Sequence, residues 1–184
     1  MRSLRWLAPL AIGVAVFFSA LLAGLPLARA VDAVSVRGDA PAIDLTAVLD
    51  HQRSESDRIQ VSTAPGTDGI VRRIEVRSRE GGQNWVVFAL ANNTDDQLDR
   101  LIVAPHYRMV ASGLLWPDLG LSRIATITPS TGDRPEKQAN PTAAVFRITR
   151  DPGAVITFVV ELRSDRLPQL YLWEPEAYKD KVNS

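Results

Sequence analysis

The sequence contains no cysteine, and only two of its 184 residues are histidine. The missing thiols exclude disulfides, thiol catalysis and zinc–thiolate sites. The two histidines, His51 and His106, belong to no HExxH pattern. No D-x-D-x-D-G calcium loop, G-x-S-x-G elbow or phosphate-binding glycine motif is present either. We therefore expect a protein that is not an enzyme, with no catalytic residues, no metal and no cofactor.

An excess of basic residues is also lacking, since 21 lysines and arginines balance 21 acidic residues. Nucleic-acid-binding domains carry a clustered basic excess, so no nucleic-acid partner is expected. A chain of this length can bury a sufficient apolar core without disulfides.

Acidic residues are absent from the first thirty positions. Arg2 and Arg5 precede a mostly apolar run over 6–27, and an A-x-A site follows at Ala28–Ala30. This order is typical of a secretory signal peptide cleaved after Ala30. The apolar run is long enough that an uncleaved signal anchor is the alternative. Both interpretations place the rest of the chain outside the cytoplasm.

After residue 30 the chain is divided by clusters of Gly, Pro, Asn and Asp into short runs rich in Val, Ile, Phe and Thr. Such runs predict β-strands, and their near-regular spacing favours an all-β sandwich or barrel. The predicted strands are Ala33–Arg37, Arg58–Ser62, Ile70–Ser78, Asn84–Ala91, Leu98–Pro105, Tyr107–Ala111, Arg123–Thr128, Ala143–Thr149, Val155–Arg163 and Gln169–Trp173.

Two of these strands carry distinct hydrophobic patterns. In ITFVVEL (156–162) the apolar residues alternate, which indicates one buried face on Ile156, Phe158, Val160 and Leu162. WVVFAL (85–90) is apolar on both faces, so we expect it in the middle of a sheet that is covered on both sides.

Two other segments are predicted not to be strands. Asp44–Arg53 places Leu45, Val48 and Leu49 at helical spacing after a possible N-cap at Asp44, which predicts one short helix. Ser130–Pro141 is the most loop-like part of the chain.

The carboxylate pair Asp95–Asp96 stands in the run NNTDDQLD. Such a pair could bind calcium or act as acid and base. Asn and Asp clusters between strands are more typical of turns, and we favour a turn here.

The aromatic residues are the strongest indication of a ligand site. Trp85 begins an apolar strand and is predicted to be core, whereas Trp173 shares a face with Tyr171. Trp116, in LLWPDLGL (114–121), either plugs the sandwich end or forms an exposed platform, and its large apolar ring favours burial. The candidate ligand-binding residues are Trp116 with Tyr107 or Asp118 beside it.

Two longer segments show a recognisable order of strands and turns. WVVFALANNTDDQLDRLIVAPHYRM (85–109) has an aromatic-led strand, an N-N-T turn and two further strands. VFRITRDPGAVITFVVELRSDRLPQLYLWEPEAY (145–178) has a strand, a D-P-G turn, a long alternating strand, an S-D-R loop and a final strand. Together they resemble the periplasmic sensory domain of bacterial seven-transmembrane receptors with diverse intracellular signalling modules. The likeness is greatest to alphaproteobacterial versions whose cytoplasmic parts act in cyclic di-GMP signalling.

The resemblance implies a jelly-roll-like antiparallel β-sandwich, similar in architecture to a carbohydrate-binding module, over 31–173. It implies a non-enzymatic signal-transduction role, in which the domain senses a small molecule such as a carbohydrate, or a periplasmic protein. A secreted carbohydrate-binding module and a periplasmic protein-interaction module are the alternatives. The resemblance also implies a location in the periplasm or on the extracytoplasmic face of the inner membrane, and it assigns no binding residues.

The chain departs from that family at its C-terminus. Family members continue into the first membrane helix, whereas 174–184 is polar and ends the sequence. We interpret this segment as a connector and the chain as a fragment of a longer receptor that is attached to the inner membrane; a free-standing secreted form is the alternative.

Overall fold

Strand β6 (Asn84–Asn92) lies in the middle of the first of two sheets. On one side it pairs with β13 (Val155–Leu162), which pairs in turn with β10 (Ile124–Pro129). On its other side, β1 (Ala33–Val36) and β3 (Asp50–Arg53) pair with two successive parts of its edge. The β1–β6 pairing is parallel, and the others in this sheet are antiparallel.

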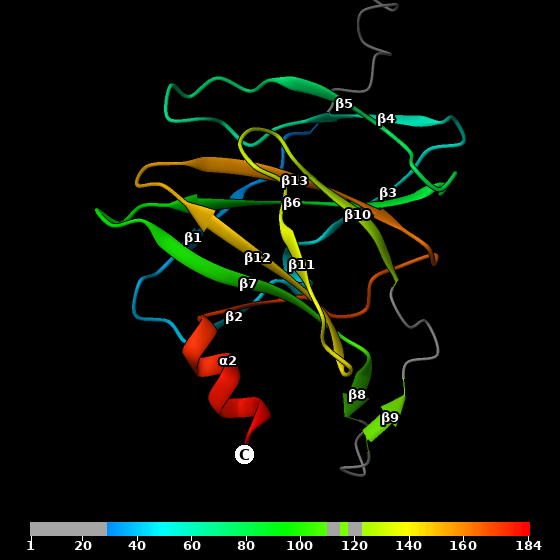
Figure 1. Cartoon of the computed structure of the whole chain (residues 1–184). Helices are drawn as coiled ribbons and strands as arrows, with labels where there is room; N and C mark the ends of the chain where they lie inside the picture. Colours follow the sequence, from blue (N-terminus) through cyan, green and yellow to red (C-terminus); the bar gives the residue numbers. More distant parts are fainter. Residues whose placement is uncertain (1–28, 110–114, 118–122) are drawn as a thin grey trace, which may run out of the picture.

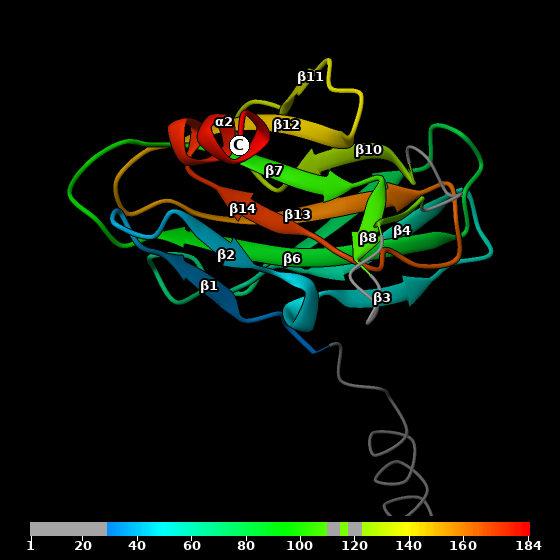
Figure 2. The same ribbon diagram turned by 90° about the horizontal axis from the view of Figure 1, so that it is seen from below.

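The second sheet is antiparallel throughout its described pairings. Its strands, in spatial order, are β11 (Glu136–Gln138), β12 (Ala143–Arg150), β7 (Leu98–Pro105), β14 (Tyr171–Trp173) and β2 (Ala42–Asp44). This computed structural model describes residues 29–109, 115–117 and 123–184. The two sheets lie face to face (Figures 1 and 2), so the prediction of an all-β sandwich is confirmed.

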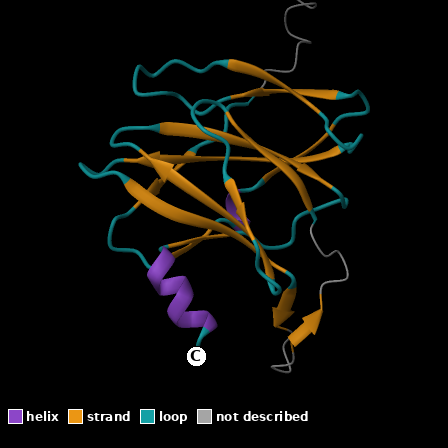
Figure 3. Ribbon diagram, viewed as in Figure 1, coloured by secondary structure: helices purple, strands orange, loops and turns teal. Residues whose placement is uncertain are grey.

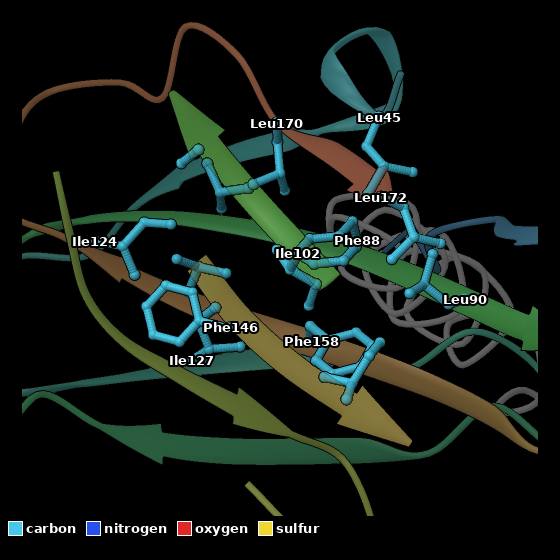
Figure 4. Packing of buried hydrophobic residues seen from close by; sticks show 14 of the residues in the cluster. Leu45, Phe88, Leu90, Ile102, Ile124, Ile127, Phe146, Phe158, Leu170 and Leu172 are labelled. Carbon is cyan, nitrogen blue, oxygen red and sulfur yellow. The ribbon is translucent and has the colours of Figure 1, made fainter. Parts of the chain in front are cut away.

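The main core fills the space between the two sheets. Figure 4 shows Phe88 and Phe158 of the first sheet facing Ile102 and Leu172 of the second. The two phenylalanine rings stack with centroids 5.1 Å apart and an interplanar angle of 18°. Burial of these apolar side chains is the main driving force that holds the sheets together.

A third layer covers the outer face of the first sheet. The hairpin β4 (Arg58–Ser62) and β5 (Arg73–Arg77) lies above that sheet in Figure 1. Its Ile59, Val61 and Val76 pack with Trp85, Val87 and Val159. The predictions that Trp85 is core and that its strand is covered on both sides are confirmed.

The expectation of only one buried face on β13 is wrong for the same reason. Thr157, Val159 and Glu161 are as buried as the alternate residues, because the hairpin packs on Val159, its loop bonds to Thr157 through the Ala64 N–H, and the 78–82 loop covers Glu161. Alternating hydrophobicity reports which face is apolar, and it does not exclude a cover over the other face.

Helix α2 (Pro175–Val182) covers the outer face of the second sheet (Figure 3). The Glu174 side chain caps its first turn by accepting hydrogen bonds from the backbone N–H groups of Glu176 and Ala177. Tyr178 packs on the sheet and lies 5.8 Å from the Trp173 ring. The predicted connector 174–184 is therefore mostly helical and docked on the sandwich.

The predicted helix Asp44–Arg53 is wrong. Its residues form the end of β2, a 3₁₀ turn (Thr46–Val48) and strand β3. Leu45 is buried between the sheets, whereas Val48 is 46% exposed, so the apolar residues do not share one buried face. Backbone pairing of this segment with β14 and β6 outweighs the weak intrinsic preference of a short helix.

Most strand boundaries agree with the sequence predictions to within one residue. Ile70–Ser78 begins late, at Arg73, because Ile70 belongs to the hairpin loop, and Gln169–Trp173 begins at Tyr171. Ser130–Pro141, expected to be a loop, contains β11. The remaining strands are β8 (Tyr107–Met109) and the unpredicted β9 (Leu115–Pro117); the rest of Tyr107–Ala111 lies outside the described residues.

Candidate functional site

The inner face of the second sheet carries two arginines at one end of the sandwich. On β7 the inward residues follow the series Leu98, Arg100, Ile102, Ala104, and on β12 the series Ala144, Phe146, Ile148, Arg150. The strand register sets Arg100 opposite Ile148 and Arg150 opposite Leu98. The two guanidinium groups therefore alternate with aliphatic side chains on one buried surface.

Arg100 is fully buried and is satisfied by backbone oxygens. Its Nη1 donates to Asp99 O at 2.8 Å, and its Nη2 donates to the carbonyls of Arg37 and Gly38 at 3.4 and 3.3 Å. These bonds tie the loop after β1 to the second sheet. Arg100 thus has a structural role as well as a charge at the site.

Arg150 is less well satisfied. Its Nη1 donates to Thr149 O at 2.7 Å, but its Nε and Nη2 are buried and have no hydrogen-bond partner in the part of the chain that the structure describes. The guanidinium carbon lies 5.1 Å from the centroid of the Phe158 ring, a cation–π contact. Burial lowers the pKa of Arg150, and the charges of Asp133 and Asp151 only partly offset that effect.

The two arginines line a pocket between the sheets, which we call the arginine pocket. Its other walls are Asn92 and five aliphatic side chains: Val36, Leu90, Leu98, Ile148 and Leu172. The cavity volume is about 10 Å³, enough for one water-sized group. No carboxylate belongs to the walls, so the described lining carries two positive charges and no negative one.

Asn92, the only uncharged polar side chain in the lining, is fully engaged elsewhere. Its Nδ2 donates to Asp96 O and Arg150 O, and its Oδ1 accepts from the N–H and hydroxyl of Thr94. The buried side-chain polar atoms of the lining residues that have no partner among the described residues are the Nε and Nη2 of Arg150. These bonds also form the turn that carries Asp95, so the turn prediction for Asp95–Asp96 is confirmed.

Glu161 is the other charged side chain buried in the sandwich, on the opposite face of the first sheet. It accepts hydrogen bonds from the Ser78 hydroxyl at 2.5 Å and from the backbone N–H groups of Arg79, Glu80 and Gly82 at 2.9, 3.1 and 3.2 Å. Burial raises the pKa of Glu161, but these hydrogen bonds outweigh it and leave the pKa below the ordinary value of 4.5. This carboxylate holds the 78–82 loop to the sheet.

The residues predicted to bind a ligand lie in a different part of the fold. Tyr107 begins β8 and is 40% exposed, and the β8–β9 pairing sets it opposite Pro117. Trp116 belongs to β9, opposite Arg108, but its side chain lies outside the described residues, and so does Asp118. A site on this hairpin remains a prediction.

The two histidines and Trp173, also considered in the sequence, lie among residues of the fold and outside the arginine pocket. The His51 Nε2 accepts a hydrogen bond from the Leu167 N–H at 3.2 Å, whereas the His106 Nε2 is buried without a partner in the described residues. The Trp173 ring is partly covered by Tyr178 and by the Lys181 ammonium, 4.8 Å from the ring centroid. Trp173 is therefore part of the α2 interface.

Neither a metal-binding cluster nor a membrane-spanning helix is found in residues 29–109, 115–117 and 123–184. No group of three or more His, Asp or Glu side chains there is placed to hold a metal ion. No helix there is long and apolar enough to cross a membrane.

Sequence reasoning missed the arginine pocket, although a signal was present. In VFRITR (145–150) the alternation places Arg150 on the face of Phe146 and Ile148, and Arg147 on the opposite face. The sequence does not show that this face is the inner one, and without that information the alternation does not predict a binding site.

Comparison with known proteins identifies no relative: no family model, no curated protein and no solved structure matches this chain.

Proposed function

We propose that this chain is a non-enzymatic sensor domain of a bacterial membrane signalling receptor and binds its ligand on the extracytoplasmic side of the inner membrane. The observation that carries the proposal is the arginine pocket. A buried guanidinium with unpaired N–H groups is costly to retain, and in native proteins such groups are usually matched by a partner. A ligand that supplies this partner would bind the folded state selectively.

The position of the pocket supports a sensor rather than a passive binder. Strand β14 contributes Leu172 to the pocket wall on its inner side. The next residue, Trp173, faces the outer side and contacts Tyr178 of α2. A ligand that shifts β14 by a small amount would therefore change the packing of the C-terminal helix.

In this proposal α2 is the output element, through which ligand occupancy reaches a membrane segment of the intact receptor. A ligand can shift such an equilibrium only by its different affinity for the two states. The free energy of α2 docking is the quantity that must change.

A screen of sugars and small anions by thermal denaturation, followed by hydrogen–deuterium exchange, tests this function. A compound that binds the pocket should raise the melting temperature and alter amide exchange over Tyr171–Val182. Val61, on the distant hairpin, provides a control region in which exchange should stay unchanged. Binding at the pocket with no change in α2 exchange would contradict the sensor role.

A further inference from the structure

The residues that line the arginine pocket indicate the chemical class of ligand that it binds. Resting on the sensor function proposed above, we infer that the pocket binds the carboxylate of a short aliphatic monocarboxylic acid, with Arg150 as the anchoring residue. The unpaired, buried edge of the Arg150 guanidinium, the charge of the walls and their one-sided polarity support this inference.

The Nε and Nη2 atoms of Arg150 lie on the same edge of the guanidinium, and this edge offers two parallel N–H donors. Such a fork matches the two oxygens of a carboxylate. The same molecule uses this edge twice: Arg163 donates through Nε and Nη2 to the two Glu80 oxygens at 2.8 and 2.9 Å, and Arg147 donates through the same atoms to Asp99. In Arg150 the equivalent pair is buried and has no protein partner among the described residues.

Charge favours an anion over a neutral ligand. A water molecule or a sugar hydroxyl could accept the two hydrogen bonds, but neither would neutralise the positive walls formed by Arg150 and Arg100. Buried charges in proteins are normally paired with an opposite charge. A carboxylate supplies both the two acceptors and the negative charge.

The distribution of polar atoms favours a carboxylate over inorganic anions. The buried unpaired donors of the lining belong to one residue, Arg150, because the Asn92 amide is engaged by Thr94 and by backbone oxygens. Sulfate and phosphate carry oxygens in every direction and would place some of them against Leu90, Ile148 and the other aliphatic walls. A short alkyl chain would instead bury apolar surface there.

The size of the pocket limits the chain length. The cavity holds about one water-sized group, so the carboxylate end would occupy it and the alkyl chain would extend along the aliphatic mouth. We therefore expect short, unbranched acids such as butyrate to bind in preference to longer or branched ones.

Calorimetric titration of the purified chain with sodium butyrate in chloride-free HEPES–Tris buffer tests this inference. We expect saturable binding by butyrate, much weaker binding by chloride or sulfate, and none by 1-butanol, which has the same chain length without the charge. Arg150→Met should weaken butyrate binding roughly 10- to 100-fold, as expected for hydrogen bonds to a charged group.

Arg147→Met is the matched control, because Arg147 lies on the same strand and faces the solvent side, paired with Asp99. Its butyrate affinity should stay within about twofold of the wild type. The melting temperature without ligand supplies a second readout: Arg150→Met should melt at or above the wild-type temperature, since it removes an unpaired buried charge. A fall in melting temperature with no butyrate binding by the wild type would assign Arg150 a purely structural role and overturn the inference.

The two proposals fail in different ways. If sulfate or a sugar binds through Arg150 and alters α2 while butyrate does not, the ligand class is wrong and the sensor function stands. If butyrate binds through Arg150 and α2 exchange is unaffected, the ligand class stands and the sensor function is wrong.

Discussion

Glu161 and Arg150 both bring a charge into the interior of the sandwich, and they differ in how that charge is matched. The Glu161 carboxylate accepts four hydrogen bonds at 2.5–3.2 Å from the 78–82 loop. The Arg150 guanidinium leaves two buried donors without a protein partner in the described residues. The pKa of both groups is lowered, which for the acid favours the charged form and for the base disfavours it.

This difference separates a structural site from a binding site. A fully matched buried charge stabilises the fold only as long as every partner stays in place, whereas an incompletely matched one is available to a ligand. Removing the Glu161 charge should therefore destabilise the protein, and removing the Arg150 charge should not.

The largest effect is expected for Glu161→Leu. The substitution removes the acceptor of the Ser78 hydroxyl and of three backbone N–H groups, which should lower the free energy of unfolding by about 3–5 kcal/mol. Urea denaturation followed by circular dichroism measures this change. Glu161→Gln retains one acceptor oxygen and should lose clearly less; equal losses would contradict the hydrogen-bond explanation.

A smaller effect is expected for Gly82→Ala, which tests how closely the loop must approach Glu161. A Cβ at Gly82 would lie 2.8 Å from the Leu162 carbonyl oxygen and 3.2 Å from the Glu161 side chain. Because the carbonyl belongs to the buried strand β13, it cannot move easily, and we expect a loss of about 1–3 kcal/mol. Gly38→Ala is the control, since its nearest neighbour is a Thr94 methyl at 3.8 Å, and its effect on the urea midpoint should be slight.

The pH dependence of the free energy of unfolding should include a contribution from the titration of Glu161. The folded-state pKa of Glu161 lies below 4.5, so its contribution is complete above pH 4.5 and is lost as the pH falls through the folded-state value. Urea denaturation between pH 7 and pH 3 should show a steeper loss for the wild type than for Glu161→Gln, which has no proton to bind. Parallel curves for the two proteins would assign the acid sensitivity to other groups.

The smallest effect is expected for Glu80→Gln in the same loop. Glu80 forms a bidentate ion pair with Arg163, but the two side chains are 45% and 40% exposed to solvent. Exposed ion pairs contribute little, so the loss should stay below about 1 kcal/mol and shrink further in high salt. A loss equal to that of Glu161→Leu would show that burial does not distinguish these two acids.

The sequence predicted the positions of strands and turns better than the tertiary contacts that those strands make. Alternating residues located β12 and β13, and the Asn92–Asp96 run identified its own turn through local hydrogen bonds. The helix expected over Asp44–Arg53 failed because strand pairing with distant residues decided its conformation. The arginine pocket was not predicted because the alternation of residues in a strand does not show whether the face that carries the arginine is buried or exposed.

What the sequence by itself determined is the all-β character of the chain, most strand positions and the central, doubly covered place of β6. These follow from local propensity, from the two-residue period of a strand and from turn chemistry. Only the tertiary structure decided which faces became interior. The 78–82 loop covered Glu161, and the facing sheet placed the Phe158 ring against Arg150, while α2 packed on the other side of the Arg150 sheet. Most of those contacts join residues far apart in sequence, and the sequence of a strand alone does not determine which distant element will pack on it.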